Sequence, residues 1–256
     1  MSTTGILLVT GATSGFGKAI ATLFASQKWN VIITGRRSER LLALKTELEQ
    51  SHGVKVWMLC FDVRDEIAVN QAIAGLPDEW KNIDVLINNA GLALGKDVLQ
   101  EGDSMQWITM IDTNIKGLLY VTKAVAPLLI QRKKGTIINI GSIAGKESYV
   151  GGNVYSATKF AVDGLTKNMR LDFLPHHIRV SQIAPGAAET EFSVVRFSGD
   201  QSKADATYKG FVPLDARDIA EAAWFIASRP AHVCINDLVI MPTAQANATT
   251  IHRNNS

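Results

Sequence analysis

Short apolar runs alternate along the chain with longer segments in which apolar residues recur every three or four positions. Continuous apolar runs are typical of parallel strands buried on both faces, and the longer period is typical of helices with one apolar face. The expected strands span residues 6–10, 31–34, 55–60, 85–88, 136–140, 178–183 and 238–241. The expected helices span residues 17–27, 39–50, 66–74, 105–131, 155–173 and 217–228.

Strand and helix segments alternate, which predicts a protein of the α/β class. We expect a single-domain, Rossmann-type doubly wound sheet of about seven parallel strands, with helices on both faces. No proline- or glycine-rich linker interrupts the 256 residues, so one domain should span residues 1–246. Within it, the polar and irregular segment 187–212 is the expected substrate lid, and a polar C-terminal tail follows at 247–256.

Composition and charge exclude several other classes of protein. Forty-six per cent of the residues are hydrophobic, and the net charge of +2 without a dense basic run argues against nucleic acid as a partner. No apolar run reaches the roughly 18 residues that a membrane span needs. No positively charged segment precedes the first apolar stretch, so no signal peptide is expected.

Cys60 and Cys234 are the only cysteines, and each lies in or beside an apolar run. We therefore expect buried thiols in the reducing cytoplasm rather than a disulfide. Neither cysteine belongs to a cluster with metal-ligand spacing, and no histidine has a ligand partner at a suitable distance in the sequence. No metal site is expected.

A glycine-rich turn follows the first strand directly and leads into a helix. Strand, glycine turn and helix together predict a dinucleotide site, because the glycines allow the backbone to approach a pyrophosphate that the helix N-terminus stabilises. The glycine spacing departs from the common G-x-G-x-x-G pattern, and a turn without a nucleotide is the alternative interpretation. The residues expected to contact the cofactor here are Gly11, Thr13, Ser14, Gly15, Phe16 and Gly17.

Two arginines, Arg36 and Arg37, follow the second strand. In NAD enzymes an acidic residue near this strand end binds the ribose hydroxyls. A carboxylate would repel a 2′-phosphate, whereas a guanidinium binds it through charge-assisted hydrogen bonds, so the sequence predicts NADP(H) as the cofactor. The alternative is a basic helix start that binds no ligand.

Tyr155 and Lys159 are separated by about one helical turn and project from the same helix face. A neighbouring cation lowers the pKa of a phenol, and the hydroxyl of Ser142 upstream could hold a carbonyl oxygen. These groups predict a proton-transfer site that interconverts an alcohol and a carbonyl, with the hydride passing to a cofactor. For an isolated tyrosine–lysine pair, a surface phenol and a solvated charge would be the alternative.

Several motifs in this order resemble the short-chain dehydrogenase/reductase family over essentially the whole chain. The resemblance implies a catalytic set of Asn114, Ser142, Tyr155 and Lys159, in which Tyr155 transfers the proton, Lys159 also binds the nicotinamide ribose, and Asn114 holds a water molecule. It further implies cofactor contacts from Asp62, Val63, Asn89, Ala90, Gly91, Pro185 and Gly186.

A closer resemblance is to the branch of NADP-dependent 3-hydroxy acid dehydrogenases, including the serine 3-dehydrogenases. The loop Gly186-Ala-Ala-Glu-Thr190 departs from the form expected for this branch. The loop lies on the substrate and nicotinamide side, so the departure affects the identity of the substrate and not the type of reaction. The segments that carry the resemblance are Gly151-Gly-Asn-Val-Tyr155, Asp172-Phe-Leu-Pro-His176, Thr190-Glu-Phe-Ser193, Val195-Arg-Phe197, Pro230-Ala-His-Val233 and Met241-Pro242.

Arg196 is the main indication of the substrate, since it is one arginine in a mostly neutral stretch of the expected lid. It could bind a substrate carboxylate or sulfonate, and the alternative is a surface arginine paired with Glu191 or Asp200. Tyr149 and Asn153 could complete the anion site. Gln245 and Arg253 in the C-terminal region are further candidates, unless that region is an ordinary frayed end.

We therefore expect an NADP(H)-dependent oxidoreductase that interconverts a small acidic alcohol and its aldehyde or ketone. The acidic group would be the carboxylate of a 3-hydroxy acid or semialdehyde, or the sulfonate of sulfoacetaldehyde and isethionate. The alternatives are a reductase of a larger neutral ketone or acyl thioester, and a non-catalytic NADP(H)-sensing protein. Excess apolar residues on helices 105–131 and 155–173, together with the family resemblance, predict a homotetramer.

Overall fold

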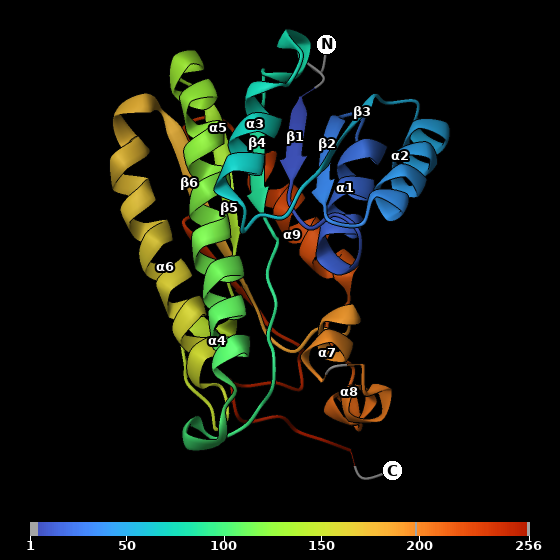
Figure 1. The fold of residues 1–256 in the computed structure, drawn as a ribbon, viewed down its shortest axis with the longest axis vertical. Helices are drawn as coiled ribbons and strands as arrows, with labels where there is room; N and C mark the ends of the chain where they lie inside the picture. Colours follow the sequence, from blue (N-terminus) through green and yellow to red (C-terminus); the bar gives the residue numbers. More distant parts are fainter. Residues whose placement is uncertain (1–4, 198, 255–256) are drawn as a thin grey trace.

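The computed structural model describes residues 5–197 and 199–254 and contains one seven-stranded sheet (Figure 1). The strands are all parallel and lie in the order β3-β2-β1-β4-β5-β6-β7. This confirms the predicted doubly wound α/β fold. The strands are β1 (Ile6–Val9), β2 (Asn30–Gly35), β3 (Val56–Cys60), β4 (Val85–Asn88), β5 (Gly135–Ile140), β6 (Ile178–Pro185) and β7 (Asp237–Ile240).

Helices connect the strands and cover both faces of the sheet (Figure 1). The α-helices are α1 (Gly15–Ser26), α2 (Ser38–His52), α3 (Glu66–Ala74), α4 (Ser104–Ile111), α5 (Leu118–Arg132), α6 (Asn153–Phe173), α7 (Glu191–Arg196), α8 (Gln201–Tyr208) and α9 (Ala216–Ala227). The shorter helical segments are η1 (Asp78–Trp80), η2 (Leu99–Glu101), η3 (Asp112–Gly117), η4 (Ile143–Gly145) and η5 (Leu174–His176).

The strand side chains alternate between two apolar layers, which explains why the strands are apolar throughout. Leu7 and Val9 of β1 belong to the layer formed with α1, α2 and α9, whereas Ile6 and Leu8 belong to the layer formed with α3, α5 and α6. A strand that is covered on both faces gains stability from every apolar position along it. The sheet therefore forms a rigid base for the loops at its carboxyl edge.

The strand order reverses at the centre of the sheet, where β1 pairs with both β2 and β4. In doubly wound sheets, a crevice opens beyond the carboxyl ends of the strands at such a point. The glycine turn after β1 and the Asn88–Gly91 segment at the end of β4 meet at this edge. The fold thus brings together two motifs that lie about 80 residues apart in the sequence, as the parallel topology requires.

The predicted helix 105–131 is interrupted by η3, a π-helical segment between α4 and α5. A π-helical turn accommodates one extra residue, and such turns occur frequently at functional sites. Asn114 lies in this segment and is almost fully buried. Its side chain accepts a hydrogen bond from the Leu92 amide at 2.9 Å and donates to the Leu92 carbonyl at 2.8 Å. The interruption therefore attaches the helix to the loop after β4.

The structure corrects two of our sequence-based expectations. The segment 187–212 is not irregular, since it contains α7 and α8, each with an N-terminal residue whose side chain accepts a backbone hydrogen bond. Cys60 and Cys234 are both exposed free cysteines rather than buried thiols. Cys60 ends the edge strand β3, where one side of the sheet has no neighbouring strand, and Cys234 precedes β7 at the other edge.

The C-terminal region folds back onto its own chain. Residues 244–252 form a small antiparallel turn with a bridge between Gln245 and Ile251. The Asn254 amide then donates to the Gly210 carbonyl just beyond α8. Residues 255 and 256 of the predicted tail lie outside the described residues. No helix within the described ranges is long and apolar enough to cross a membrane.

Candidate active site

The loops after β1 and β4 are joined by the side chains of Thr10 and Asn89. The Thr10 hydroxyl accepts hydrogen bonds from the amides of Asn89 and Ala90, at 3.0 and 2.9 Å. The Asn89 side-chain amide donates to the Thr10 carbonyl at 2.8 Å and to the Gly11 carbonyl at 3.3 Å. These bonds hold the glycine turn against the centre of the sheet.

Each glycine of this turn is required for a steric reason of its own. Gly11 and Gly15 adopt left-handed backbone angles, with φ of 67° and 50°. A Cβ atom on Gly17 would lie 2.3 Å from the Gly11 carbonyl oxygen, so no other residue fits there. Ser14 is extended and immediately precedes α1, and Phe16 packs against the apolar layer beneath the turn. The expected glycine turn is thus present at the start of α1, and its contact with a pyrophosphate stays a prediction.

Arg37, rather than Arg36, contacts the glycine turn. Its guanidinium donates to the Thr13 hydroxyl from Nε at 3.1 Å and from Nη2 at 2.6 Å, and to the Ser14 hydroxyl at 3.1 Å. Arg36 lies 3.7 Å from the carboxylate of Asp62, at the end of the neighbouring strand. Both arginines therefore lie at the carboxyl edge of the sheet, Arg37 beside the glycine turn and Arg36 beside Asp62. Val63 is buried and packs against Gly117. A Cβ atom on Gly117 would lie 2.7 Å from the Val63 side chain.

The four residues of the predicted catalytic set lie around the loop after β4 and the start of α6. Tyr155 and Lys159 are 9 % and 7 % exposed. The Lys159 ammonium donates to the Ile140 carbonyl at 2.9 Å and lies 5.9 Å from the centre of the Tyr155 ring. Asn114 also donates to the Thr158 hydroxyl of α6 at 3.0 Å.

The remaining hydroxyl of the set and the loop glycine complete this arrangement. The Ser142 hydroxyl accepts from the Ala144 amide at 3.1 Å, which fixes it at the start of η4. A Cβ on Gly91 would lie 3.3 Å from Asn114 Oδ1 and 3.7 Å from Lys159 Nζ. Gly91 thus leaves open the space between these two polar groups, and the structure brings all four residues of the set together.

Burial dominates the ionisation of the two groups on α6. It raises the pKa of the Tyr155 phenol well above its usual value, while the nearby Ser142 hydroxyl and the Arg196 guanidinium act in the opposite direction. Burial lowers the pKa of Lys159 to about 8. In this arrangement burial, and not the lysine expected to lower it, dominates the pKa of the phenol. The ammonium donates its hydrogen bond to the Ile140 carbonyl, and its nitrogen lies 5.9 Å from the centre of the ring.

Arg196 lies next to the Tyr155 ring. Its Nη2 donates to the Tyr149 hydroxyl at 2.8 Å, and its Nε donates to the Gly95 carbonyl at 3.2 Å. The guanidinium carbon lies 5.6 Å from the centres of both the Tyr149 and Tyr155 rings. The alternative expectation, a surface arginine paired with Glu191, is not what the structure shows, because Glu191 pairs with Arg37 and Arg40.

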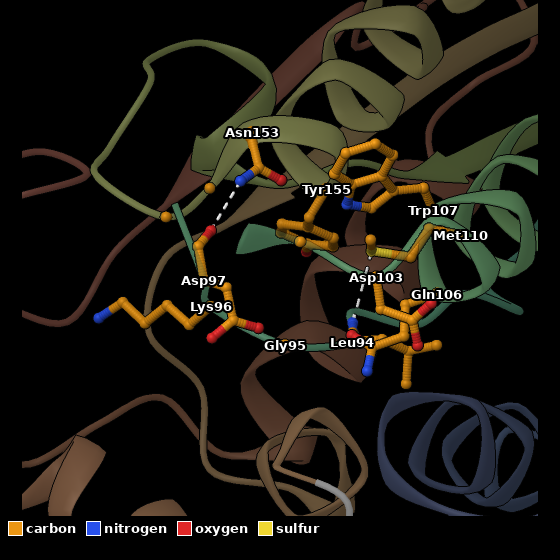
Figure 2. A pocket seen from close by; sticks show the side chains of 13 residues that line it. Leu94, Gly95, Lys96, Asp97, Asp103, Gln106, Trp107, Met110, Asn153 and Tyr155 are labelled. Carbon is orange, nitrogen blue, oxygen red and sulfur yellow. Dashed lines mark hydrogen bonds between the residues drawn. The ribbon is translucent and has the colours of Figure 1, made fainter. Parts of the chain in front are cut away.

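Figure 2 shows a pocket between the Tyr155 ring, the loop after β4 and helix α4. The Asn153 side chain reaches from the start of α6 to the Asp97 carbonyl, to which it donates at 2.8 Å. Trp107 and Met110 close the pocket from α4, and the Met110 sulfur accepts from the Leu94 amide at 3.4 Å. Asn153 thus lines the pocket and also fixes its wall.

The two C-terminal candidates engage other groups. Gln245 is 7 % exposed, and its side chain accepts from the Ala187 amide at 2.7 Å and donates to the Asn247 carbonyl at 3.0 Å. It therefore holds the loop that begins with Pro185 and Gly186. Arg253 lies over the Phe211 ring and donates to the Thr207 carbonyl at 3.0 Å, so it is attached to the end of α8.

Several residues of the site were missed from the sequence. Phe192 lies with its ring centre 5.8 Å from that of Tyr155, and Trp107 and Met110 line the pocket. Phe192 belongs to a motif that carried the family resemblance, which was a usable signal. The two α4 residues gave none, because their apolar spacing resembles that of any helix packed on a core. Among the described residues, no group of three or more potential ligands is placed to hold a metal ion.

Comparison with known proteins agrees with this geometry. The family model described as short chain dehydrogenase matches residues 5–200, and the chain belongs to this family. The NADP-dependent 3-hydroxy acid dehydrogenase YdfG of Escherichia coli strain K12 is 49 % identical over 250 residues, which cover 97 % of this chain and 99 % of that protein.

Two further similarities come from a reductase and a solved structure. Sulfoacetaldehyde reductase 2 of Chromohalobacter salexigens is 50 % identical over 242 residues, covering 94 % of this chain and 95 % of the relative. The closed form of serine dehydrogenase complexed with NADP+ superimposes with a TM-score of 0.91 at 48 % identity, covering 97 % of this chain and 99 % of the other.

We predict that the buried ammonium makes stability depend on pH. A lysine whose folded pKa lies below its unfolded value destabilises the fold while it is charged, and this penalty disappears as the pH rises above the folded pKa. The Lys159→Met variant should therefore exceed the unmodified protein in unfolding free energy near pH 7.5. The difference should shrink by about 2–3 kcal/mol between pH 8 and 10, at roughly 1.36 kcal/mol per pH unit. Urea denaturation across this range measures it, and a constant difference would contradict the effect of burial.

Proposed function

We propose that the protein is an NADP(H)-dependent oxidoreductase that interconverts a small acidic alcohol and its aldehyde or ketone. The observation that carries the substrate class is the position of Arg196, whose guanidinium lies 5.6 Å from the centre of the Tyr155 ring. A cation held beside the proton donor suits a substrate whose carbonyl lies one or two bonds from an anion. The names of the 3-hydroxy acid dehydrogenase and sulfoacetaldehyde reductase relatives support the same class.

The cofactor residues fit NADP(H). Gly11, Gly15 and Gly17 form a turn whose backbone is free of side chains, and the start of α1 faces it. The guanidiniums of Arg36 and Arg37 flank the end of β2, where a 2′-phosphate would need positive charge. Asp62, Val63, Asn89, Ala90, Gly91, Pro185 and Gly186 line the same carboxyl edge and complete the proposed cofactor contacts.

In the reducing direction Tyr155 donates its phenolic proton to the substrate oxygen. NADPH, when bound, supplies the hydride. Because burial keeps the phenol protonated at neutral pH, the donor is present in the required form. The Ser142 hydroxyl orients the substrate oxygen, and the Lys159 ammonium, 5.9 Å from the centre of the Tyr155 ring, provides positive charge as the phenolic proton leaves. Asn114 shapes the path towards Lys159 at Gly91.

The anion site of the proposed substrate is formed by Arg196 with Tyr149, and Asn153 lines the adjacent pocket wall. Segment 187–212 serves as the lid, since α7 presents Phe192 and Arg196 to Tyr155. Gln245 and Arg253 remain predicted substrate residues. Their contacts with Ala187 and with the end of α8 favour an indirect effect, through the position of the lid.

We also propose that the enzyme is a cytoplasmic homotetramer. Apolar side chains on α4, α5 and α6 are exposed in the single chain, with Met105 at 67 % and Leu171 at 69 % exposed, which supports burial between subunits. The two free cysteines support a reducing compartment. Reduction is the expected cellular direction, because the NADPH pool is kept reduced.

The direct test of the chemistry is Tyr155→Phe. Loss of the positioned proton donor should lower the turnover rate by at least about 10²-fold. Cofactor affinity should change little, since the phenol does not bind the phosphates. Steady-state assays with NADPH across carboxylated, sulfonated and neutral aldehydes, together with a fluorescence titration of NADPH, measure both effects. A fully active variant would place the acid elsewhere.

Cofactor choice should depend on the arginines after β2. We expect a preference for NADPH over NADH in the unmodified enzyme, and Arg36→Asp should shift the preference towards NADH. Each lost charged hydrogen bond costs on the order of 1.5–3 kcal/mol. Arg37→Asp should have the larger effect, because Arg37 is the residue that bonds the glycine turn. Comparison of kcat/KM for the two cofactors checks this, and equal values in the unmodified enzyme would refute it.

Substrate choice should depend on Arg196. Arg196→Ala should raise the Michaelis constant for an acidic aldehyde far more than for a neutral aldehyde of similar size. An unpaired charge left in the site costs roughly 2–5 kcal/mol. Arg217→Ala, which removes an exposed guanidinium from α9, is the matched control. If Arg196→Ala weakens both aldehydes equally, the substrate is a neutral carbonyl compound.

The proposed tetramer can be tested by measuring the mass of the assembly in solution. Light scattering at micromolar concentration should give the mass of four chains, each of 27.8 kDa. Replacing Met105 and Leu171 by glutamate should lower this mass, because both side chains lie on the helix faces proposed to be buried. A monomer mass for the unmodified protein would rule out the tetramer.

A further inference from the structure

A carboxylate of the chain itself lies between two arginines at the cofactor edge. Glu191 is the first residue of α7. Both of its carboxylate oxygens lie 3.0 Å from Arg40 Nη1, and one of them lies 3.5 Å from Arg37 Nη1. All three side chains are about half exposed, so this bridge is accessible to a competing anion.

The bridge lies directly beside the glycine turn. Arg37 uses its other nitrogens to bond the hydroxyls of Thr13 and Ser14. Thr190, the residue before Glu191, is so close to the turn that a Cβ on Gly15 would lie 3.5 Å from it. The Glu191 carboxylate therefore occupies a position where two guanidiniums and the phosphate-binding turn converge.

We propose that Glu191 and Arg40 are specificity-determining residues, in which the Glu191 carboxylate is an internal counter-anion that a 2′-phosphate displaces from Arg37 and Arg40. This inference rests on the proposed NADP(H) specificity. It adds Arg40 as a third cation of the phosphate site, one turn into α2 from Arg37. It also assigns Glu191 an effect of opposite sign, because its carboxylate competes with the phosphate for the same guanidiniums.

The direction of the exchange follows from charge. A phosphate monoester carries about two negative charges at neutral pH and three strong acceptor oxygens, against a single charge on the carboxylate. It is therefore the stronger partner for a pair of guanidiniums. A nucleotide without the 2′-phosphate leaves the bridge in place, so α7 stays attached to α2. A nucleotide with the phosphate releases the first turn of α7, which couples the choice of cofactor to the segment that carries Arg196 and Phe192.

Binding of adenosine 2′-monophosphate and adenosine 5′-monophosphate to the full-length protein, measured by calorimetry at low salt, tests the exchange. Glu191→Gln should tighten binding of the 2′-phosphate about threefold to tenfold, since two exposed ion pairs no longer compete. Arg40→Gln should weaken it by about fivefold to twentyfold. Neither variant should change binding of the 5′-phosphate by more than about twofold.

Two matched variants control for net charge. Glu189→Gln removes an exposed carboxylate two residues away from the bridge, and Arg217→Gln removes an exposed guanidinium from α9. Both should bind adenosine 2′-monophosphate like the unmodified protein. Hydrogen exchange of the α7 amides gives an independent measurement, since the 2′-phosphate should accelerate exchange in the first turn of α7 and the 5′-phosphate should not.

The outcomes separate this inference from the proposed cofactor. If the unmodified protein does not distinguish the two nucleotides, the NADP(H) assignment fails, and the exchange fails with it. If it prefers the 2′-phosphate, but Glu191→Gln binds unchanged or more weakly, the cofactor assignment stands and the counter-anion role is overturned. Equal tightening in Glu189→Gln would also overturn it, because the effect would then be one of net charge alone.

Discussion

The active site depends on the hydrogen bonds that join the loops after β1 and β4. The Thr10 hydroxyl accepts a hydrogen bond from the Asn89 backbone amide, and the Asn89 side chain donates one to the Thr10 carbonyl. These bonds hold the glycine turn in a position where residue 17 has no space for a side chain. One backbone bond continues from β1 to β4 here, since the Thr10 amide donates to the Ile87 carbonyl at 3.0 Å. The side chains of Thr10 and Asn89 add the further bonds that fix the two loops at the point where the strand order reverses.

Placing a lysine in this environment is costly, and the surrounding structure explains how the cost is met. Lys159 is 7 % exposed and has one strong acceptor, the Ile140 carbonyl. Burial lowers its pKa to about 8, so the charged form is only moderately favoured at neutral pH. The π-helical turn that carries Asn114 and the absence of a side chain at Gly91 keep polar atoms close to the ammonium. The fold thus gives up stability at Lys159, the residue whose charge the proposed chemistry uses.

The sequence predicted the layers of this fold well and the details of its site less completely. Buried parallel strands are recognisable because both faces select apolar residues, and each predicted strand is present within a few residues. The interruption at residues 112–117 was not predicted, because the π-helical turn is coupled to a long-range hydrogen bond. In this bond the Leu92 amide, in the loop after β4, donates to the Asn114 side chain. Helices α7 and α8 were missed because their mixed composition has no clear apolar period. The ionisation of Tyr155 depends on burial, which motif spacing does not show.

The proposed substrate choice follows from how Arg196 is held. The guanidinium is already bonded to Tyr149 and Gly95 and lies 5.6 Å from the centres of two aromatic rings, so little side-chain freedom is left to lose when a substrate binds. A neutral carbonyl compound would leave this cation without an anionic partner, whereas a carboxylate or sulfonate would neutralise it. The same charge acts on the phenol, whose ionised form it stabilises. An anion bound at Arg196 offsets part of this charge, so the anionic group of the proposed substrate and the phenol respond to the same guanidinium. Arg196 is thereby placed to act on both the proposed substrate and the proposed proton donor.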